Sequence, residues 1–174
     1  MDPKDLKQLI KMAENGDYRA QFKLAFMHLK GDSVARDVAR CAYWYKKAAE
    51  QGYTSAQYNL ADLYLRGAGV EQDFVEARYW FEQAAEDGDV DAQFNLGLIY
   101  SQGKGVEQSD EIAFTWFLKA AENGSARAMY DIATRHMDGV GTEQNVELAK
   151  VWFDKAAQLG IPRAIDMLEE CEQM

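Results

Sequence analysis

The sequence repeats itself every 36 residues, and this period constrains the fold more than any other feature. Glycine, tryptophan and alanine each recur at this spacing along nearly the whole chain. The recurring residues are Gly16, Gly52, Gly88, Gly124 and Gly160, then Trp44, Trp80, Trp116 and Trp152, then Ala20, Ala56, Ala92, Ala128 and Ala164. A fixed period of this size is typical of arrays in which each unit is too small to bury its own apolar face and stacks on its neighbours. The sequence therefore predicts an elongated array of similar units.

Each unit begins with a stretch that has the apolar spacing of a helix. In the second unit, Ala56, Leu60 and Tyr64 fall on one helical face, which predicts an amphipathic helix, named here helix A. Gly67 is expected to end this helix, because glycine adopts the positive φ needed to leave a helix at low cost.

A second helix, named helix B, follows in every unit. Asp73 is expected to be the N-cap of helix B in the second unit, and Gly88 lies just past its end. Equivalent caps and stops recur in the other units, namely Asp37, Ser109 and Asn145 before the helices and Gly52, Gly124 and Gly160 after them. This agreement between units predicts an all-α solenoid of helix-turn-helix repeats with about ten helices.

The pattern assigns residues 1–174 to a single repeat domain. A leading half-unit covers residues 1–14, four full units cover 15–50, 51–86, 87–122 and 123–158, and a capping helix covers 159–174. The loop of the first unit, residues 31–36, lacks the second glycine of the other loops, so its turn is expected to differ.

These residues resemble a known family. The segments Ala92–Tyr100, Gly103–Val106 and Trp116–Ala121, followed by Gly124, are similar to the Sel-one-like (Sel1-like) repeat, a relative of the tetratricopeptide repeat. The resemblance covers essentially the whole chain in four copies with partial ends. It implies a right-handed superhelix of helix pairs, with the A helices on the concave side, and an adaptor role in a bacterial pathway.

Composition narrows the classes of partner. The net charge of −10 argues against nucleic acid, whose binding needs clustered Lys and Arg. The charge is uneven, because residues 1–66 carry 11 basic and 8 acidic side chains while residues 67–174 carry 8 basic and 21 acidic ones. The sequence has no apolar run long enough for a membrane span and no signal segment at its start, so we expect a cytoplasmic protein without membrane insertion.

Nothing in the sequence points to catalysis. Phosphate-binding loops, zinc motifs and nucleophile motifs are absent, so no catalytic residue, metal ligand or cofactor is predicted. Some cysteine-rich relatives of this repeat family have been linked to β-lactams, which gives a remote alternative of a β-lactam-binding protein. That role depends on regularly paired cysteines, whereas this chain has only Cys41 and Cys171.

The A-helix residues that face away from the core are the candidate partner-binding residues. A turn of 100° per residue away from the core stripe of Ala20, Leu24 and Met27 places positions 19, 23, 26 and 30 on the outward side. Across the units the candidates for a concave groove are Arg19, Lys23, Phe26, Lys30, Asn59, Asp62, Arg66, Asn95, Leu98, Gln102, Arg127 and Asp131.

One feature of these A helices favours a peptide ligand. Asn59 and Asn95 are expected to grip the backbone of an extended peptide, as asparagines of related tetratricopeptide proteins do, with basic residues beside them for acidic groups of the ligand. Alternatively, the asparagines bond to neighbouring helices and the bases are merely solvated. An aromatic position, occupied by Phe22, Tyr58, Phe94 and Tyr130, is interpreted as packing between adjacent A helices rather than as a floor for a partner helix.

Three functions remain open at the level of the sequence. The first is an interaction scaffold that binds a partner peptide or domain in the groove, in a regulatory, envelope-linked or host-directed pathway. The second is an inhibitor or immunity-type protein whose acidic surface blocks a basic enzyme. The third is a self-associating array, because exposed apolar residues such as Phe26 and Leu98 would support a homodimer; a monomer or a weak homodimer is expected.

Overall fold

The structure of the protein is a computed structural model that describes residues 2–172. The described residues form ten helices and no strand. The helices are α1 (Pro3–Glu14), α2 (Tyr18–Lys30), α3 (Val38–Ala49), α4 (Thr54–Arg66), α5 (Phe74–Glu86), α6 (Val90–Gln102), α7 (Asp110–Glu122), α8 (Ala126–Asp138), α9 (Val146–Gln158) and α10 (Pro162–Glu172). The prediction of an all-α repeat array is confirmed.

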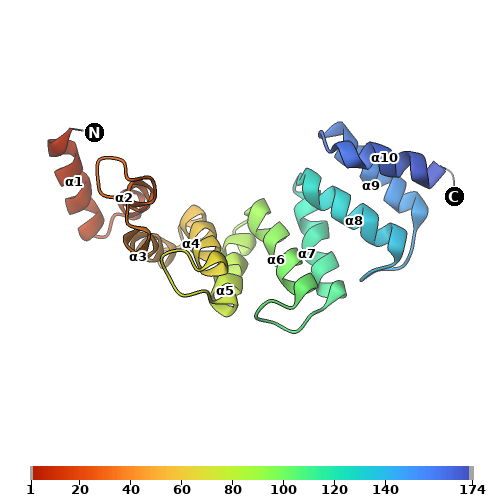
Figure 1. Ribbon diagram of the computed structural model, residues 1–174, viewed down its shortest axis with the longest axis horizontal. Coiled ribbons are helices and arrows are strands. Elements are labelled where there is room, and N and C mark those ends of the chain that lie inside the picture. The colour runs from red at the N-terminus through yellow and green to blue at the C-terminus, as the bar shows by residue number, and fades with distance from the viewer. Residues whose placement is uncertain (1, 173–174) are drawn as a thin grey trace. The chain divides into compact units, whose positions relative to one another are not determined.

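The helix starts keep the period of the sequence. Helices α2, α4, α6, α8 and α10 are the A helices and begin 36 residues apart, and the B helices α3, α5, α7 and α9 do the same. The chain divides into two compact units, residues 1–89 and 90–174. Within each unit every helix packs against the next one in chain order, from α1 to α5 and from α6 to α10 (Figure 1).

The predicted capping residues determine where the B helices begin. The carboxylate of Asp73 accepts hydrogen bonds from the backbone N–H groups of Val75 and Glu76, at 2.9 and 3.0 Å. The side chains of the other caps accept equivalent hydrogen bonds from backbone N–H groups, and these caps are Asp37, Ser109 and Asn145. At the end of α4, Gly67 has a φ of 65°, as expected for a left-handed helix stop.

The core of each unit is built on one ring per B helix. Tyr45, Phe81, Phe117 and Phe153 are fully buried and stand 36 residues apart. Each contacts the aromatic A-helix residue of its own helix pair, with ring centroids 5.3 Å apart for Phe22 and Tyr45 and 5.4 Å apart for Phe94 and Phe117. The aromatic position therefore joins an A helix to its B helix. It also contacts the following A helix, as the sequence had suggested, because the Phe22 ring centroid lies 5.0 Å from that of Tyr53, the N-cap of α4.

The first loop lacks the second glycine, but its turn keeps the conformation of the others, contrary to the prediction, and the structure shows why other loops need glycine. A Cβ atom at Gly69 would collide with the backbone of Val38, and one at Gly141 would collide with the backbone of Asp110. These glycines let each loop lie against the start of the preceding B helix. The equivalent position in the first loop is Ser33, which is exposed and adopts the same left-handed conformation with a φ of 61°.

Candidate partner-binding surfaces

The predicted groove residues form two sets, one on each unit. Helices α2 and α4 of the N-terminal unit carry Arg19, Lys23, Phe26, Lys30, Asn59, Asp62 and Arg66. Helices α6 and α8 of the C-terminal unit carry Asn95, Leu98, Gln102, Arg127 and Asp131. All of them reach solvent, and the partly buried members are Asn59, Asp62, Asn95, Leu98 and Asp131.

Helix α2 presents an exposed phenylalanine among three basic side chains. Arg19, Lys23, Phe26 and Lys30 lie on one face, because they follow at i, i+4, i+7 and i+11. The Phe26 side chain is 48% exposed, and the ammonium of Lys30 lies 5.6 Å from its ring centroid. None of these three bases forms an ion pair with a carboxylate in the described part of the chain. We call these four residues the α2 surface.

The charged candidates on α4 neutralise each other. The guanidinium Nε of Arg66 donates to Asp62 Oδ1 at 2.7 Å, one helical turn away. Next to this pair, Asn59 donates from Nδ2 to the backbone oxygen of Ser55 at 2.6 Å. A ligand on this face of α4 would therefore meet mostly hydrogen-bond acceptor atoms, together with the Asp62–Arg66 ion pair, which is already formed.

Asn95 repeats the behaviour of Asn59. Its Nδ2 donates to the backbone oxygen of Asp91 at 2.8 Å, again four residues earlier in its own helix. Neither asparagine bonds to a neighbouring helix, which the sequence had left open. In each amide the carbonyl oxygen and one N–H remain available at the surface, so the predicted role in binding a peptide backbone stays a prediction.

An ion pair joins the two A helices α6 and α8 of the C-terminal unit. Arg127 Nη2 donates to Asp91 Oδ1 at 2.7 Å, and both side chains are more than half exposed. The same guanidinium lies 4.8 Å from the ring centroid of Phe94. Leu98, by contrast, packs against the core of this unit, so little of its side chain is left for a partner. Gln102, at the end of α6, is exposed.

Asp131 occupies the position of Asn59 and Asn95 in its repeat but has a different chemistry. Burial raises the pKa of its carboxyl to about 6, although the positive charges of Arg135 and Arg127 oppose this shift. A carboxylate at this position cannot donate to the preceding turn as the asparagines do. The site therefore favours the protonated acid more than an exposed position would.

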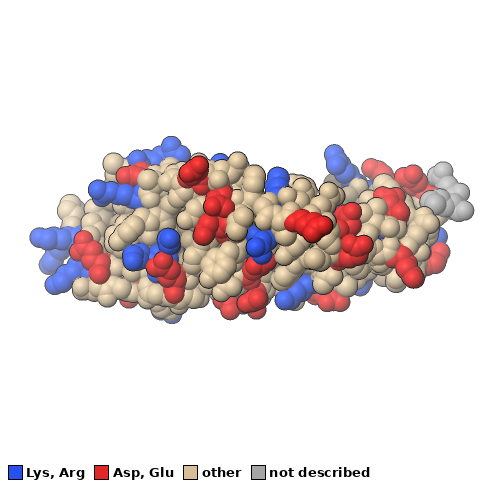
Figure 2. Space-filling view, turned by 90° about the horizontal axis from the view of Figure 1, so that it is seen from below, with Lys and Arg blue, Asp and Glu red and all other residues tan. Residues whose placement is uncertain are grey.

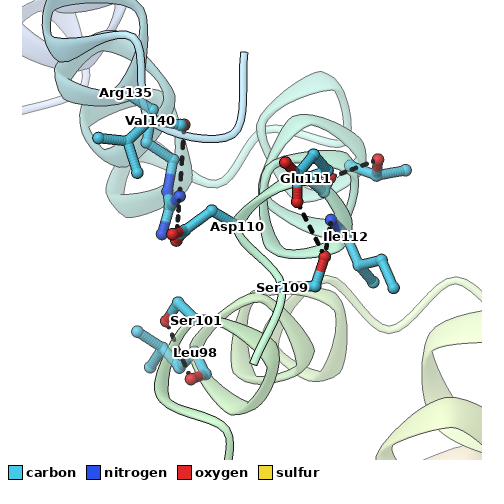
Figure 3. Close-up of polar contacts among 9 residues, drawn as sticks. Leu98, Ser101, Ser109, Asp110, Glu111, Ile112, Arg135 and Val140 are labelled. Atoms are coloured by element: carbon cyan, nitrogen blue, oxygen red, sulfur yellow. Dashed lines mark hydrogen bonds and ion pairs between the residues drawn. The ribbon is translucent and has the colours of Figure 1, made fainter. Parts of the chain in front are cut away.

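Arg135 is a functional candidate that the sequence reasoning missed. Its Nη1 donates to Asp110 Oδ1 at 3.0 Å and approaches the backbone oxygen of Val140 at 3.5 Å, so that α8 is tied to the start of α7 (Figure 3). Its guanidinium also lies 5.1 Å from the ring centroid of Phe117. A sequence signal existed, because the equivalent residues of the other repeats are the apolar Met27, Leu63 and Ile99.

Charge is distributed unequally over the surface. On the face drawn in Figure 2, Lys and Arg gather over the N-terminal helices, whereas Asp and Glu are more numerous toward the C-terminal helices. Residues 2–172 contain no group of three or more potential metal ligands. Within the same residues no helix has the length and apolarity that crossing a bilayer requires.

Comparisons with known proteins agree with this architecture. The Sel1 repeat model matches four consecutive segments, residues 19–53, 54–89, 90–125 and 126–161. No curated protein matches the chain. Among solved structures, a protective antigen of uropathogenic Escherichia coli with an SLR fold is 35% identical with a TM-score of 0.89, and the match covers 94% of this chain but only 35% of the antigen.

Two further structures extend the comparison. A Sel1 repeat protein from Oxalobacter formigenes is 30% identical with a TM-score of 0.87, over 93% of this chain and 67% of that protein. Cysteine-rich protein B of Helicobacter pylori is 22% identical with a TM-score of 0.61, over 79% of this chain and 99% of that protein, and shares the fold. Four matched repeats, with helices in the same register, show that the chain belongs to the Sel1 repeat family.

Proposed function

We propose that this chain is a non-enzymatic scaffold that binds a partner protein or peptide on the outward faces of its A helices. Sel1 repeat proteins are generally scaffolds for protein interactions. The observation that carries the proposal for this chain is the α2 surface, where an exposed phenylalanine stands among three basic side chains that have no carboxylate partner.

The chemistry of the α2 surface specifies the kind of partner. Exposure of an aromatic ring to water is unfavourable, so binding is stabilised when an apolar side chain of the partner covers the ring. Unpaired Arg and Lys side chains attract carboxylates, and this attraction steers encounter and fixes orientation. The partner segment is therefore acidic, with an apolar side chain that covers Phe26.

The other candidate residues would extend this contact. Asn59 and Asn95 offer carbonyl oxygens and an N–H to a peptide backbone, each within its own unit. The charged candidates already form ion pairs, Arg66 with Asp62 and Arg127 with Asp91. They therefore contribute to shape and specificity more than to charge attraction. The α2 surface is consequently expected to supply most of the affinity.

Substitutions taken from the other repeats test the α2 surface without new strain. Lys23→Asn, Phe26→Thr and Lys30→Gln introduce the residues found at the same positions in other units, namely Asn59, Thr134 and Gln102. The partner would be captured from a lysate with the parent chain, identified, and measured by calorimetry against the triple variant. We expect the triple variant to bind at least about tenfold more weakly, and affinity to fall as salt is added.

A charge change on a B helix supplies the control. Lys46 is exposed on the B helix α3, and the equivalent residue of the next repeat is Glu82. Lys46→Glu alters the net charge by as much as two of the substitutions above, but it should leave affinity unchanged. Equal loss of affinity in Lys46→Glu and in the triple variant would reject the α2 surface as the binding site.

The acidic balance of residues 67–174 supports a second candidate. From residue 67 onward acidic side chains outnumber basic ones 21 to 8, which suits an inhibitor or immunity-type protein that blocks a basic enzyme. In that case the captured partner would be basic, and the triple variant of α2 would bind it as well as the parent does. The same two measurements therefore separate the candidates.

A further inference from the structure

Two pockets of the N-terminal unit are built from equivalent repeat positions. The Tyr43 pocket is lined by Glu14, Gly16, Gln21, Tyr43, Trp44 and Lys47, with a volume of about 500 Å³. The Tyr79 pocket is lined by Glu50, Gly52, Gln57, Tyr79, Trp80 and Gln83, with a volume of about 300 Å³. Each lies where a B-type helix ends and the next A helix begins, and is also lined by the following B helix. They differ in two features that point to a ligand.

The first feature is a missing cation. In the Tyr43 pocket, the ammonium of Lys47 lies 5.9 Å from the centroid of the Tyr43 ring. In the later repeats the equivalent lysines lie over the neighbouring tryptophan instead, with Lys119 5.1 Å from Trp116 and Lys155 4.0 Å from Trp152.

In the Tyr79 pocket the equivalent residue is Gln83, which carries no charge. Tyr79 and Trp80 contact each other in an edge-to-face pair with centroids 4.9 Å apart, and Tyr79 is 47% exposed. Among the described residues no Lys or Arg lies over either ring. The pocket therefore has the aromatic faces of a cation site without the cation.

The second feature is a hydrogen-bond acceptor that has no donor. Gln57 is 5% exposed, and its Oε1 is buried without a hydrogen-bond partner in the described part of the chain. The equivalent Gln21 Oε1 accepts from Gln51 Nε2 at 2.8 Å. In place of Gln51 the second repeat has Asp87, an acceptor, whose Oδ2 bonds to Thr54 instead.

A buried acceptor without a partner costs free energy, and a ligand that donates to it removes this cost. The Gln57 amide is loosely held, since its Nε2 reaches the backbone oxygen of Ala49 only at 3.5 Å. A small rotation would let Oε1 meet a donor that enters the pocket.

The electrostatic field of the pocket also favours a cation. Glu50, the residue that caps α3, contributes a carboxylate at the pocket rim. The carbonyl end of α3 lies beside it and adds the negative end of a helix dipole. Lys47 reaches Glu50 only at 4.0 Å and with both side chains nearly half exposed, so this carboxylate remains largely available.

We propose that the Tyr79 pocket binds an arginine side chain of a partner protein. The planar guanidinium lies over the Tyr79 ring, donates to Gln57 Oε1, and pairs with Glu50. Arginine fits this set better than lysine, because its fork of donors can reach two acceptors at once while its flat face covers a ring. The pocket is a second contact point, and it does not depend on the α2 surface being a binding site.

The arginine derivative N-acetyl-argininamide is a direct probe of this pocket. Titration of the ¹⁵N-labelled full chain should shift the side-chain amide of Gln57 and the indole N–H of Trp80, with a dissociation constant in the millimolar range. N-acetyl-lysinamide should bind several-fold more weakly, and an uncharged glutamine derivative should not bind. Equal binding of the arginine and lysine probes, or shifts at Trp44 as large as those at Trp80, would overturn the proposal.

Variants that carry residues of the other repeats make the test specific. Gln83→Lys provides the internal cation of the other units and should weaken arginine binding about tenfold. Tyr79→Thr, which introduces the residue at position 115, should weaken it similarly by removing the ring. The matched control Tyr43→Thr should leave the affinity unchanged. Unchanged affinity in both pocket variants, with thermal unfolding equal to that of the parent, would contradict the assignment.

Discussion

Gln51 Nε2 donates to the Oε1 of Gln21, 2.8 Å away, and so links the turn after α3 to helix α2. In the C-terminal unit Asn123 Nδ2 makes the equivalent bond to Gln93 Oε1 at 3.0 Å. Both bonds are partly buried and link residues 30 positions apart. The second repeat lacks this link, because Asp87 cannot donate to Gln57.

Asp87→Asn should restore the missing link. The new amide can donate to Gln57 Oε1 and still accept from Thr54, so we expect the free energy of unfolding to rise by about 1 kcal/mol. Urea denaturation would measure the change. Gln51→Asp is the reciprocal experiment and should destabilise the chain, because Gln21 Oε1 would then lack a donor, as Gln57 Oε1 does now. A gain of stability in Gln51→Asp would contradict this account.

Asp131→Asn should stabilise the chain at neutral pH. The folded-state pKa of about 6 lies above the usual value of 3.8, so the folded chain holds this proton more tightly than the unfolded chain does. Stability contributed by Asp131 is therefore complete at low pH and is lost as the pH rises from about 4 to about 6. The amide does not ionise, so the variant avoids this loss.

The expected gain is up to about 2 kcal/mol near pH 7 and close to zero near pH 4. Denaturation curves of both proteins across this range would measure it. Asn95→Asp is the complementary control, because it introduces a carboxyl at the equivalent position of the preceding repeat. It should create a similar loss of stability at neutral pH. A gain for Asp131→Asn that does not change with pH would show that ionisation is not the cause.

Gly69→Ala should destabilise the chain far more than Gly52→Ala. Both glycines have positive φ, which costs a residue with a side chain about 1 kcal/mol. A Cβ at Gly52 meets nothing within 4 Å, whereas one at Gly69 collides with the backbone of Val38, which cannot move aside cheaply. We expect losses of about 1 and at least about 3 kcal/mol in the free energy of unfolding. Similar losses for the two variants would refute the close-approach explanation.

The repeat period made the fold predictable from sequence. Many helix boundaries carry local signals, such as the Asp73 carboxylate at the start of α5 and Gly67 at the end of α4. Each kind of signal recurs in several repeats, so a chance match in one repeat does not mislead the prediction. The direction of the aromatic position was less predictable. Phe22 packs against both Tyr45 of its own B helix and Tyr53 at the start of the next A helix, and the sequence spacing alone indicated only the second contact.

The candidate surfaces were predicted only in outline. Helical geometry correctly placed Lys23 and Phe26 at the surface, but it could not show that Asn59 bonds to its own helix. Leu98 was misjudged as exposed, because a 100° step per residue does not reveal how far the neighbouring helix covers a side chain. Pairs between repeats, such as Arg127 with Asp91, depend on the stacking of helices, which a single repeat does not encode.

Arg135 and Asp110 form a pair that replaces two apolar residues. The equivalents of Asp110 in the other full repeats are Val38, Phe74 and Val146, and the equivalents of Arg135 are also apolar. Arg135→Leu alone should cost about 1 kcal/mol, since Asp110 is 37% exposed and can be solvated. Asp110→Val alone should cost more, about 2–3 kcal/mol, because the Arg135 side chain is only 13% exposed and loses its counter-charge.

The double variant Arg135→Leu with Asp110→Val should be nearly as stable as the parent. It recreates the apolar combination of Leu63 and Val38, which occupy the same two positions 72 residues earlier. An ion pair that is partly buried adds little over a packed apolar pair. A double-mutant cycle from urea denaturation would give a coupling free energy of about 3–4 kcal/mol. If the losses of the two single variants simply add in the double variant, the two side chains do not depend on each other and the α7–α8 link has a different origin.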